Sequence, residues 1–426
     1  MSREARGLVL FAALNVVLVN LLVAFGLGTP WRDTSLGPLG WFATARQGGD
    51  SWRPMNEALD YLEEPGTKTL YRRMFFTDRV KHKGFQYPPT SLLPIWGLRH
   101  VFGDAAQSCV EWITWLCVPL TVWLAVSIAE RGRERPEGET ARDRALRIAT
   151  LAVLALAFYP TLRAYRNGQI QTWINLAFAA SVWAWPRGRA VPAGALAGAI
   201  ALIKPQYALL AAWGLLRRRW PFVAAAAAVG LGGLALSIAL FGLAPHLEYL
   251  RVLQYIARRG ETFYPNQSFN GLLNRWFENG DSVGWMETFP PQHPWVYAGT
   301  MISSALLLAL AFFGPRARRA PGGVADLCLM GVVLTIASPI AWEHHHGVLL
   351  PAFAYLYSRA AAEGWGRGLW CVLAGAFVLA SHSFMATNAL ADTPLGVLQS
   401  YRLFAALAVV VLLARTAPTS ASSPGC

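Results

Sequence analysis

Apolar stretches recur along the chain from residue 8 to residue 413, and polar segments of different lengths separate them. A helix that crosses a membrane needs about twenty apolar residues, and shorter helices are tolerated inside a bundle. On this basis the pattern predicts about twelve transmembrane helices in an all-α polytopic membrane protein. The predicted spans are residues 6–26, 107–129, 147–164, 169–186, 190–203, 206–217, 221–243, 296–314, 322–340, 346–359, 366–384 and 397–415.

Two apolar segments are predicted to depart from a straight crossing. If residues 88–103 crossed the membrane, the sidedness of every later segment would be inverted, so we expect this segment to be interfacial or re-entrant. Residues 190–216 have arginines on both flanks and contain Lys204-Pro205. Because proline interrupts a helix, this segment is predicted to form two short helices that meet near the outer surface, with Lys204 facing outward.

Composition supports a membrane protein. Of the 426 residues, 54% are hydrophobic and only 14% are charged, whereas about a quarter of the residues in a soluble domain are charged. The net charge is +13. The arginines form small clusters between apolar runs, which is typical of cytoplasmic loops and argues against nucleic-acid binding. These clusters lie at residues 187–189, 217–219, 316–319 and 359–367.

With those clusters in the cytoplasm, the long polar segments 27–106 and 244–295 both fall on the outer side. The turn at Asn167-Gly168-Gln169, Lys204 and the histidine cluster fall on that side too. We expect residues 1–416 to form one membrane domain whose first span is an uncleaved signal anchor. Residues 417–426 are expected to be a disordered cytoplasmic tail.

The sequence Trp342-Glu343-His344-His345-His346 raises the question of a metal site. Consecutive helical residues point about 100° apart, so three adjacent histidines cannot all face one ion. The cysteines also lack the spacing of a metal site. We therefore expect no metal and no other cofactor, and histidines that bond to a polar ligand or handle a proton.

Asp50 follows Gly48-Gly49 soon after the first predicted span. A carboxylate on such a turn can approach the membrane surface and accept a proton from a hydroxyl group. The alternative is a loop or helix-capping aspartate.

Arg163, Arg166, Asn167 and Gln169 lie where one predicted span ends and the next begins. Guanidinium groups suit phosphate, and amides suit sugar hydroxyls. The alternative is that the arginines are anchors whose charged ends reach the membrane surface, and that the amides cap a helix. Lys204 lies in an apolar stretch and needs an anion, either a protein carboxylate or a lipid phosphate.

In the second outer segment, Asn266 and Gln267 belong to a polar sequence that is typical of a ligand-facing loop or of a plain turn.

Together these motifs resemble glycosyltransferase family 87 over about residues 48–350. The motifs are Gly48-Gly49-Asp50 with Leu70-Tyr71, Tyr87-Pro88-Pro89, Asn167-Gly168-Gln169, Leu196-Ala197-Gly198 with Lys204-Pro205, Asn266-Gln267-Ser268, and Ser338-Pro339 with Trp342, His344 and His345. The resemblance implies an integral-membrane enzyme of the GT-C class that uses a polyprenyl-phosphate sugar, as mannosyl- and arabinofuranosyltransferases do. It also implies short juxtamembrane helices in a large first outer loop.

The resemblance assigns the catalytic base to Asp50 and places His344 or His345 near the reacting sugar. The candidates for substrate binding are Tyr87, Arg163, Arg166, Asn167, Gln169, Lys204, Asn266, Gln267 and Trp342. Trp52-Arg53-Pro54 and the third histidine, His346, depart from the family pattern.

The predicted function is inverting transfer of mannose or arabinofuranose to a lipid or glycan acceptor, for cell-envelope biogenesis. The site would face outward from a bacterial cytoplasmic membrane, where nucleotide sugars are absent, so the donor needs a lipid carrier. A secondary transporter of a polar or anionic solute remains an alternative, because intramembrane Lys and His and broken helices also mark transport sites. A noncatalytic scaffold with the same fold is a third.

Overall fold

The computed structural model describes residues 3–64, 66, 69–77, 84–131, 139–314 and 320–416. Of these described residues, 77% are helical. Within the described ranges the only β-type pairing is one isolated antiparallel bridge, between Asn266 and Trp342. The all-α prediction is therefore confirmed, whereas the predicted tail at 417–426 lies outside the described residues.

The N-terminal half begins with a continuous helical rod that includes two π-helical stretches and continues through short helices into longer ones. Its elements are α1 (Arg3–Ala12), η1 (Ala13–Leu18), α2 (Val19–Leu21), η2 (Leu22–Gly26), η3 (Trp31–Asp33), α3 (Gly37–Ala43), α4 (Trp52–Glu63), η4 (Arg72–Thr77), η5 (Pro89–Leu92), α6 (Leu93–Phe102), η6 (Gly103–Ala105), α7 (Ala106–Ala129), α8 (Ala141–Leu156), α9 (Tyr159–Asn167), α10 (Gln171–Ala184) and η7 (Trp185–Arg187). The first long polar segment thus contains the short helices that were predicted for it.

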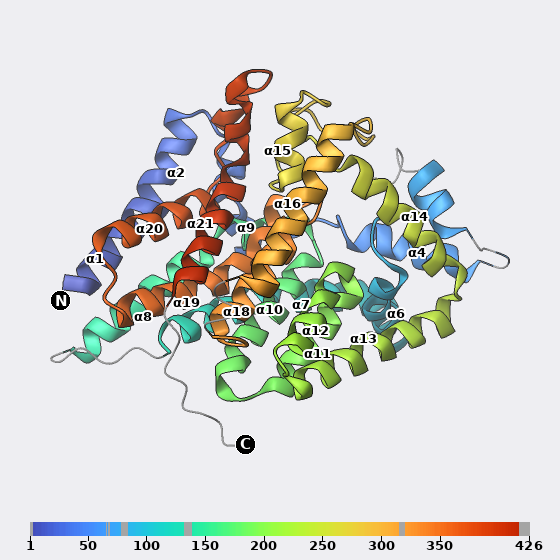
Figure 1. Cartoon of the computed structure of the whole chain (residues 1–426), viewed down its shortest axis with the longest axis horizontal. Helices are drawn as coiled ribbons and strands as arrows, with labels where there is room; N and C mark the ends of the chain where they lie inside the picture. Colours follow the sequence, from blue (N-terminus) through green and yellow to red (C-terminus); the bar gives the residue numbers. More distant parts are fainter. Residues whose placement is uncertain are drawn as a thin grey trace.

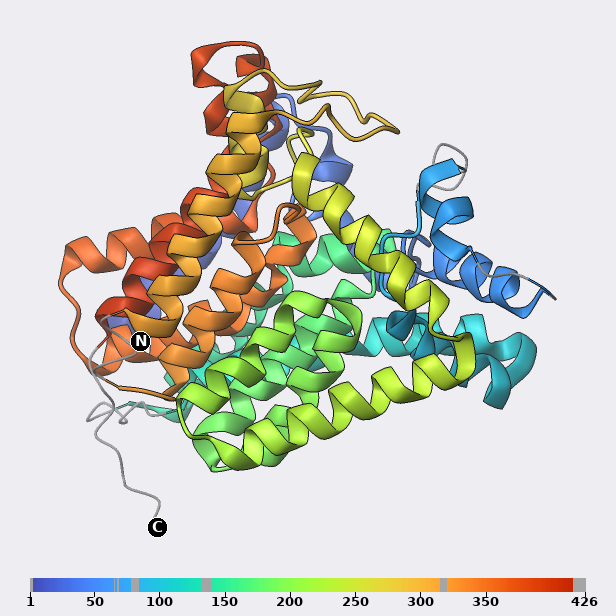
Figure 2. The same cartoon turned by 45° about the vertical axis from the view of Figure 1, so that its right-hand side comes forward.

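The C-terminal half alternates short and long helices. Its elements are α11 (Ala190–Ile203), η8 (Pro205–Ala208), α12 (Leu209–Leu216), α13 (Trp220–Phe241), α14 (Ala244–Arg259), α15 (Phe269–Trp276), α16 (Pro294–Phe313), α18 (Val324–Ile336), η9 (Glu343–Val348), α19 (Leu349–Ala362), α20 (Arg367–Ser381), η10 (Met385–Leu390), η11 (Pro394–Ser400) and α21 (Tyr401–Arg415). Figures 1 and 2 show α18 in the middle of the molecule, and nearly all its side chains are buried.

Five helical segments of the described chain are long and apolar enough to cross a membrane, or six if one bent pair counts as a span. They are Ala5–Gly26, Pro89–Ala129, Trp220–Phe241, Pro294–Phe313 and Pro394–Arg415, with Ala141–Leu156 and Tyr159–Asn167 as the bent pair. Helices such as α11, with 14 residues, span only about 21 Å of a hydrocarbon core about 30 Å thick. Length and composition thus support a membrane-spanning protein, and the count of twelve crossings stays a prediction.

Two helix breaks shape the site. The predicted break at Lys204-Pro205 is confirmed, because α11 ends at Ile203 and Lys204 has an extended backbone. The single span predicted over 147–164 is wrong in form, because α8 and α9 meet at a bend of 49°. Pro160 lies in the first turn of α9, where it fits a helix start but cannot continue α8.

Small residues let α11 and α13 pack closely. A methyl group added at Gly194 would lie 2.2 Å from the carbonyl oxygen of Phe222, and one at Gly198 would lie 2.6 Å from that of Ala226. These glycines are four residues apart on one face of α11, a spacing typical of membrane helices in close contact. The contact holds α11 in place, and with it Lys204 at its end.

Candidate active site

The loop at Gly48-Gly49-Asp50 is fixed to the end of α9 by backbone hydrogen bonds. The amide of Gly48 donates to the carbonyl of Arg166 (2.7 Å), and that of Asp50 donates to the carbonyl of Asn167 (3.0 Å). Gly168 has φ +67°, and a Cβ atom there would lie 1.8 Å from the carbonyl oxygen of Gly48. The turn therefore requires glycine, both for its left-handed backbone and for the close approach of the loop.

Side chains from three separate segments meet beside this turn. The hydroxyl groups of Ser51 and Tyr87 lie 2.9 Å apart, and both lie within 2.9 Å of Oε1 of Gln169. Nε2 of Gln169 lies 3.4 Å from Oδ2 of Asp50, whose side chain is exposed. Gln169 thus joins the candidate base to the Ser51–Tyr87 pair.

Burial raises the pKa of Tyr87 to about 12, although its hydrogen bond with Ser51 works in the opposite direction. The nearby carboxylate of Asp50 raises the pKa further. Tyr87 is therefore a neutral hydrogen-bond donor at physiological pH.

The two predicted arginines of α9 are held in ion pairs. Arg163 lies 3.4 Å from Asp33 and 3.0 Å from Glu343, and Arg166 lies 3.2 Å from Asp33. Glu343 also accepts a hydrogen bond from the hydroxyl of Tyr159 (2.9 Å). Both guanidinium groups thus already have anionic partners within the protein.

A further arginine, Arg402 of α21, is completely buried and lies 3.2 Å from Glu343. Its guanidinium also donates to the backbone carbonyls of Ala380 and His382. Arg402 therefore anchors Glu343 to the C-terminal helices. Removing one member of such a buried pair leaves an uncompensated charge, which typically costs about 3 to 5 kcal/mol.

The predicted histidine segment comes directly after Glu343 in the sequence. His344 and His345 lie edge to face, with ring centroids 4.6 Å apart, at the start of η9. Nδ1 of His345 accepts a hydrogen bond from the backbone amide of Trp342 (3.2 Å). Arg163 interacts electrostatically with His344, so the end of α9 connects this segment to the Asp50 loop.

Lys204 lies within electrostatic range of both His344 and His345. Across the part of the chain that the structure describes, no hydrogen bond or ion pair engages its ammonium group. Immediately before it, Ile200, Leu202 and Ile203 line an apolar hollow between α7, α10 and α11, with about 1380 Å³ of free space including its open mouth. Lys204 itself does not line the hollow, but it comes directly after Leu202 and Ile203, which do.

Asn266 and Gln267 are completely buried and bond to protein groups. Oδ1 of Asn266 accepts from the amide of Ala341 (2.9 Å), and Nε2 of Gln267 donates to the carbonyls of Tyr264 and Gln399. Their loop pairs with residues 339–343 and positions the histidine segment. The structure thus places these two residues behind the site, and their predicted contact with substrate has no geometric support among the described residues.

The structure therefore gathers the predicted residues into two neighbouring groups. Asp50, Tyr87, Asn167 and Gln169 form the first, and Lys204, Trp342, His344 and His345 form the second. Arg163 and Arg166 lie on α9 between the two groups, in the ion pairs described above. Asp50 and the histidines do not line the apolar hollow between α7, α10 and α11.

Sequence reasoning missed Ser51, Asp33, Glu343 and Arg402 as partners in this arrangement. The position of Arg402 in the sequence could have indicated a buried ion pair, because a charged residue within the last apolar run needs a partner inside the protein. Asp33 and Glu343 had no such signal, since their ion pairs with Arg163 join residues that are 130 or more positions apart.

Helices long enough to cross a membrane and a polar cluster at the end of α9 define an integral-membrane protein with a candidate enzyme site. The family model for glycosyltransferase family 87 matches residues 85–339, more than half of the chain, and the chain belongs to that family. It is therefore a glycosyltransferase. The match includes Tyr87, Gln169 and Lys204 but ends before Trp342 and begins after Asp50. No curated protein and no solved structure shows significant similarity to the chain.

Proposed function

We propose that this glycosyltransferase has a GT-C-like fold and moves mannose or arabinofuranose from a polyprenyl-phosphate carrier to a lipid or glycan acceptor. The reaction takes place on the outer face of a bacterial cytoplasmic membrane. The observation that supports the donor class is Lys204, whose ammonium has no partner among the described residues and whose backbone directly follows Ile203 of an apolar hollow. A prenyl chain suits the hollow, and its phosphate would supply the anion that Lys204 lacks.

Lys204 suits the departing phosphate better than the arginines of α9 do. Arg163 and Arg166 already face Asp33 and Glu343, so a phosphate would have to compete with two carboxylates. A well-placed cation in a water-poor site lowers a barrier by roughly 2 to 4 kcal/mol when it offsets charge that develops on a leaving group.

The chemical step is a direct displacement. The acceptor hydroxyl transfers its proton to the carboxylate of Asp50 while its oxygen forms a bond to the anomeric carbon. The bond between that carbon and the phosphate oxygen breaks, and polyprenyl phosphate leaves with the electron pair, which inverts the configuration. Gln169 orients Asp50, and Ser51 and Tyr87 hold Gln169.

The second group serves the donor sugar. His344 and His345 provide hydrogen bonds beside the reacting centre, and Trp342 offers an aromatic face. Asn266 and Gln267 act as positioning residues, because they hold the backbone of this segment from behind.

The test is to incubate the purified protein in detergent micelles with defined donors and an extract of envelope lipids, and to follow the mass of the products. Polyprenyl-phosphate mannose and polyprenyl-phosphate arabinofuranose are compared with the nucleotide sugar GDP-mannose. We expect a product one sugar heavier than its acceptor with one polyprenyl-phosphate donor and none with GDP-mannose. Transfer from GDP-mannose alone, or no transfer from either lipid donor, would contradict the proposal.

A further inference from the structure

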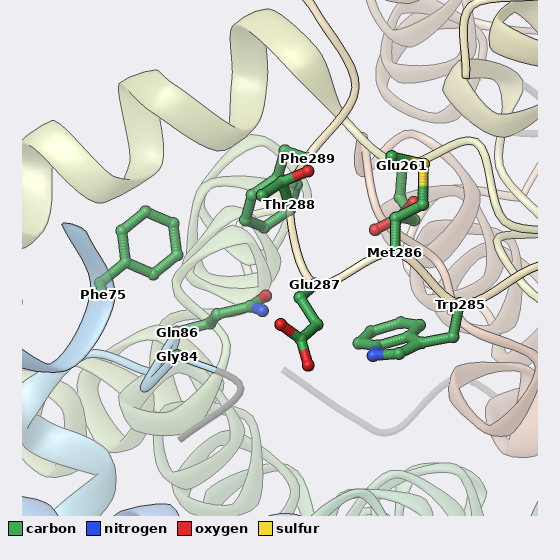
Figure 3. A pocket seen from close by; sticks show the side chains of 9 residues that line it. All are labelled: Phe75, Gly84, Gln86, Glu261, Trp285, Met286, Glu287, Thr288 and Phe289. Carbon is green, nitrogen blue, oxygen red and sulfur yellow. The ribbon is translucent and has the colours of Figure 1, made fainter. Parts of the chain in front are cut away.

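The apolar hollow between α7, α10 and α11 is large enough for a lipid chain. The middle helix, α10, packs against both of the others and forms the back of the hollow (Figure 1). The space inside measures about 630 Å³, within the range of roughly 300 to 1,000 Å³ that is usual for ligand pockets. By comparison, the space between the two long polar segments, beside Phe75, Glu261 and Phe289 (Figure 3), measures about 20 Å³, enough for one water molecule. Of these two spaces, only the apolar hollow can take up a chain.

The lining of the hollow determines what kind of chain fits. Among the described residues that line it, none carries a charge or an amide, and the hydroxyl of Thr90 donates to the backbone carbonyl of Leu202. The α7 wall is open, because Leu120 and Trp123 are 46% and 55% exposed. In a membrane-spanning protein such apolar surfaces face lipid tails. The hollow therefore suits an apolar chain that enters sideways from the membrane.

One end of the hollow lies next to the candidate active site. The lining at this end includes Trp173, near the start of α10, and Ile203, at the end of α11. Gln169 of the Asp50 group comes just before α10, and Lys204 directly follows α11. A chain whose phosphate lies in the site would thus enter the hollow at this end.

Two tryptophans close the opposite end. Trp123 of α7 and Trp183 of α10 lie with their ring centroids 5.7 Å apart. The guanidinium of Arg187 lies 3.9 Å from the centroid of the Trp183 ring and holds this ring by a cation–π contact. A chain that runs along α10 from the site therefore meets this pair and turns out toward the lipid.

The distance between the two ends sets a length. Ile113 and Trp123 on α7 are ten residues apart, as are Trp173 and Trp183 on α10, which corresponds to about 15 Å along each helix. An isoprene unit adds four carbon–carbon bonds of about 1.5 Å to a chain and so extends it by about 5 Å. The hollow thus has the length of three isoprene units.

We propose that this hollow sets the minimum length of the lipid carrier: it holds the three isoprene units next to the phosphate, and Trp123 and Trp183 direct the rest of the chain into the membrane. This inference rests on the proposed function and adds which part of the carrier the enzyme binds. Ala177 and Ala180 lie about 6 and 10 Å beyond Trp173 along α10, beside the second and the third unit. Their small side chains leave the space that these units fill.

The test uses Ala177→Leu and Ala180→Leu, with Ala228→Leu as the control, because Ala228 is exposed on α13 and lies outside the hollow. The donors carry the active sugar on prenyl phosphates of one to four and of eleven isoprene units, at defined mole fractions in the detergent. In the wild type and the control we expect the donor KM to fall roughly threefold with each of the first three units and then to stay constant, because further units gain no packing contacts with the protein. The constant value should begin at the second unit in Ala180→Leu and at the first in Ala177→Leu. A wild-type KM that keeps falling beyond the third unit, or a KM that becomes constant at the same unit in all four proteins, would overturn the inference.

Failure of the proposed function is recognised separately, because the wild type would then form no product from any lipid donor. In that case photolabelling tests the hollow directly, with farnesyl phosphate that carries a diazirine on its third unit. We expect labelled peptides from residues 117–124 or 177–183 in the wild type and in Ala228→Leu, and weaker labelling of them in Ala180→Leu.

Three results of the photolabelling would overturn the inference. The first is labelling that is absent from these residues or spread evenly over other apolar helices such as α13 and α16. The second is equal labelling in all three proteins. The third is labelling that a roughly tenfold excess of phosphatidylglycerol abolishes, because an ordinary membrane lipid would then occupy the hollow.

Discussion

At the residue scale, Gln169 connects the candidate base to its support. Its side-chain oxygen accepts from the hydroxyls of Ser51 and Tyr87, and its nitrogen lies 3.4 Å from Asp50. One residue therefore fixes the orientation of three others. Two of them, Asp50 and Tyr87, were singled out by the sequence, and Ser51 was not.

Replacing Gln169 with leucine keeps a similar volume and removes these bonds. We expect kcat to fall roughly 10- to 100-fold, because Asp50 loses its orientation, and thermal stability to fall by about 1 to 3 kcal/mol through the unpaired hydroxyls. Turnover and thermal unfolding of Gln169→Leu are measured beside Gln107→Leu, an exposed glutamine. Turnover at the wild-type rate in Gln169→Leu would show that Gln169 does not orient Asp50 for catalysis.

Glu261 makes stability depend on pH. Burial raises its pKa to about 7, although its two backbone hydrogen bonds work in the opposite direction. The folded protein thus holds this proton more tightly than the unfolded chain does. The resulting stabilisation is present below the ordinary pKa of about 4.3 and is lost as the pH rises toward 7.

We therefore expect the wild type to lose about 1 to 3 kcal/mol more stability than Glu261→Gln does between pH 4.5 and pH 8. Thermal unfolding of both proteins across this range, in one detergent, measures the difference. Parallel curves for the two proteins would show that Glu261 does not titrate in this way.

At the scale of elements, the turn between α9 and α10 determines where the Asp50 loop lies. Both sides of this contact were visible in the sequence as short glycine-containing motifs, but their docking was not, because nothing local pairs residue 48 with residue 166. The bend between α8 and α9 was not predicted either, although the position of Pro160 in the first turn of α9 accounts for it. The break at Lys204-Pro205 could be predicted, because proline and an ionisable residue interrupt an apolar run at that point.

Gly168→Ala tests this docking, with Gly188→Ala as a matched control. Both glycines have positive φ, +67° and +72°, but only Gly168 has a neighbour in the way of a methyl group. Each substitution costs about 1 to 2 kcal/mol for the backbone conformation. We expect activity to be lost only in Gly168→Ala, whose Cβ would displace the Asp50 loop. Equal activity in the two variants, with equal amounts of folded protein, would contradict the docking.

The close contact between α11 and α13 can be tested by substituting glycines of the two helices. A methyl group at Gly194 would lie 2.2 Å from a backbone oxygen of α13, whereas one at Gly230 would meet nothing within 4 Å. We expect Gly194→Ala to lower the unfolding temperature and Gly230→Ala to leave it unchanged or raise it slightly. Thermal unfolding in detergent measures both, and equal unfolding temperatures would argue against close packing of these helices.

At the scale of the whole molecule, the apolar pattern was enough to predict an all-α membrane protein and the regions of its apolar helices, but not α14 and α15, which lie in a polar segment. It was not enough to count the crossings, because α11, α12 and α18 are apolar but too short to cross by themselves, and only their packing defines their depth. The buried network of Glu343 with Arg163 and Arg402 joins α9, η9 and α21. It depends on the complete fold and has no local sequence signature.

The central claim is that Asp50 is the base of a transferase that uses a lipid-linked sugar. The most direct measurement is single-turnover transfer from the active polyprenyl-phosphate sugar by Asp50→Asn, with Asp104→Asn, at another exposed aspartate of the first long polar segment, as the control. With equal amounts of folded protein, we expect transfer by Asp50→Asn to fall at least roughly 100-fold while donor binding is retained and the control keeps wild-type rates. Transfer at the wild-type rate by Asp50→Asn would contradict the account.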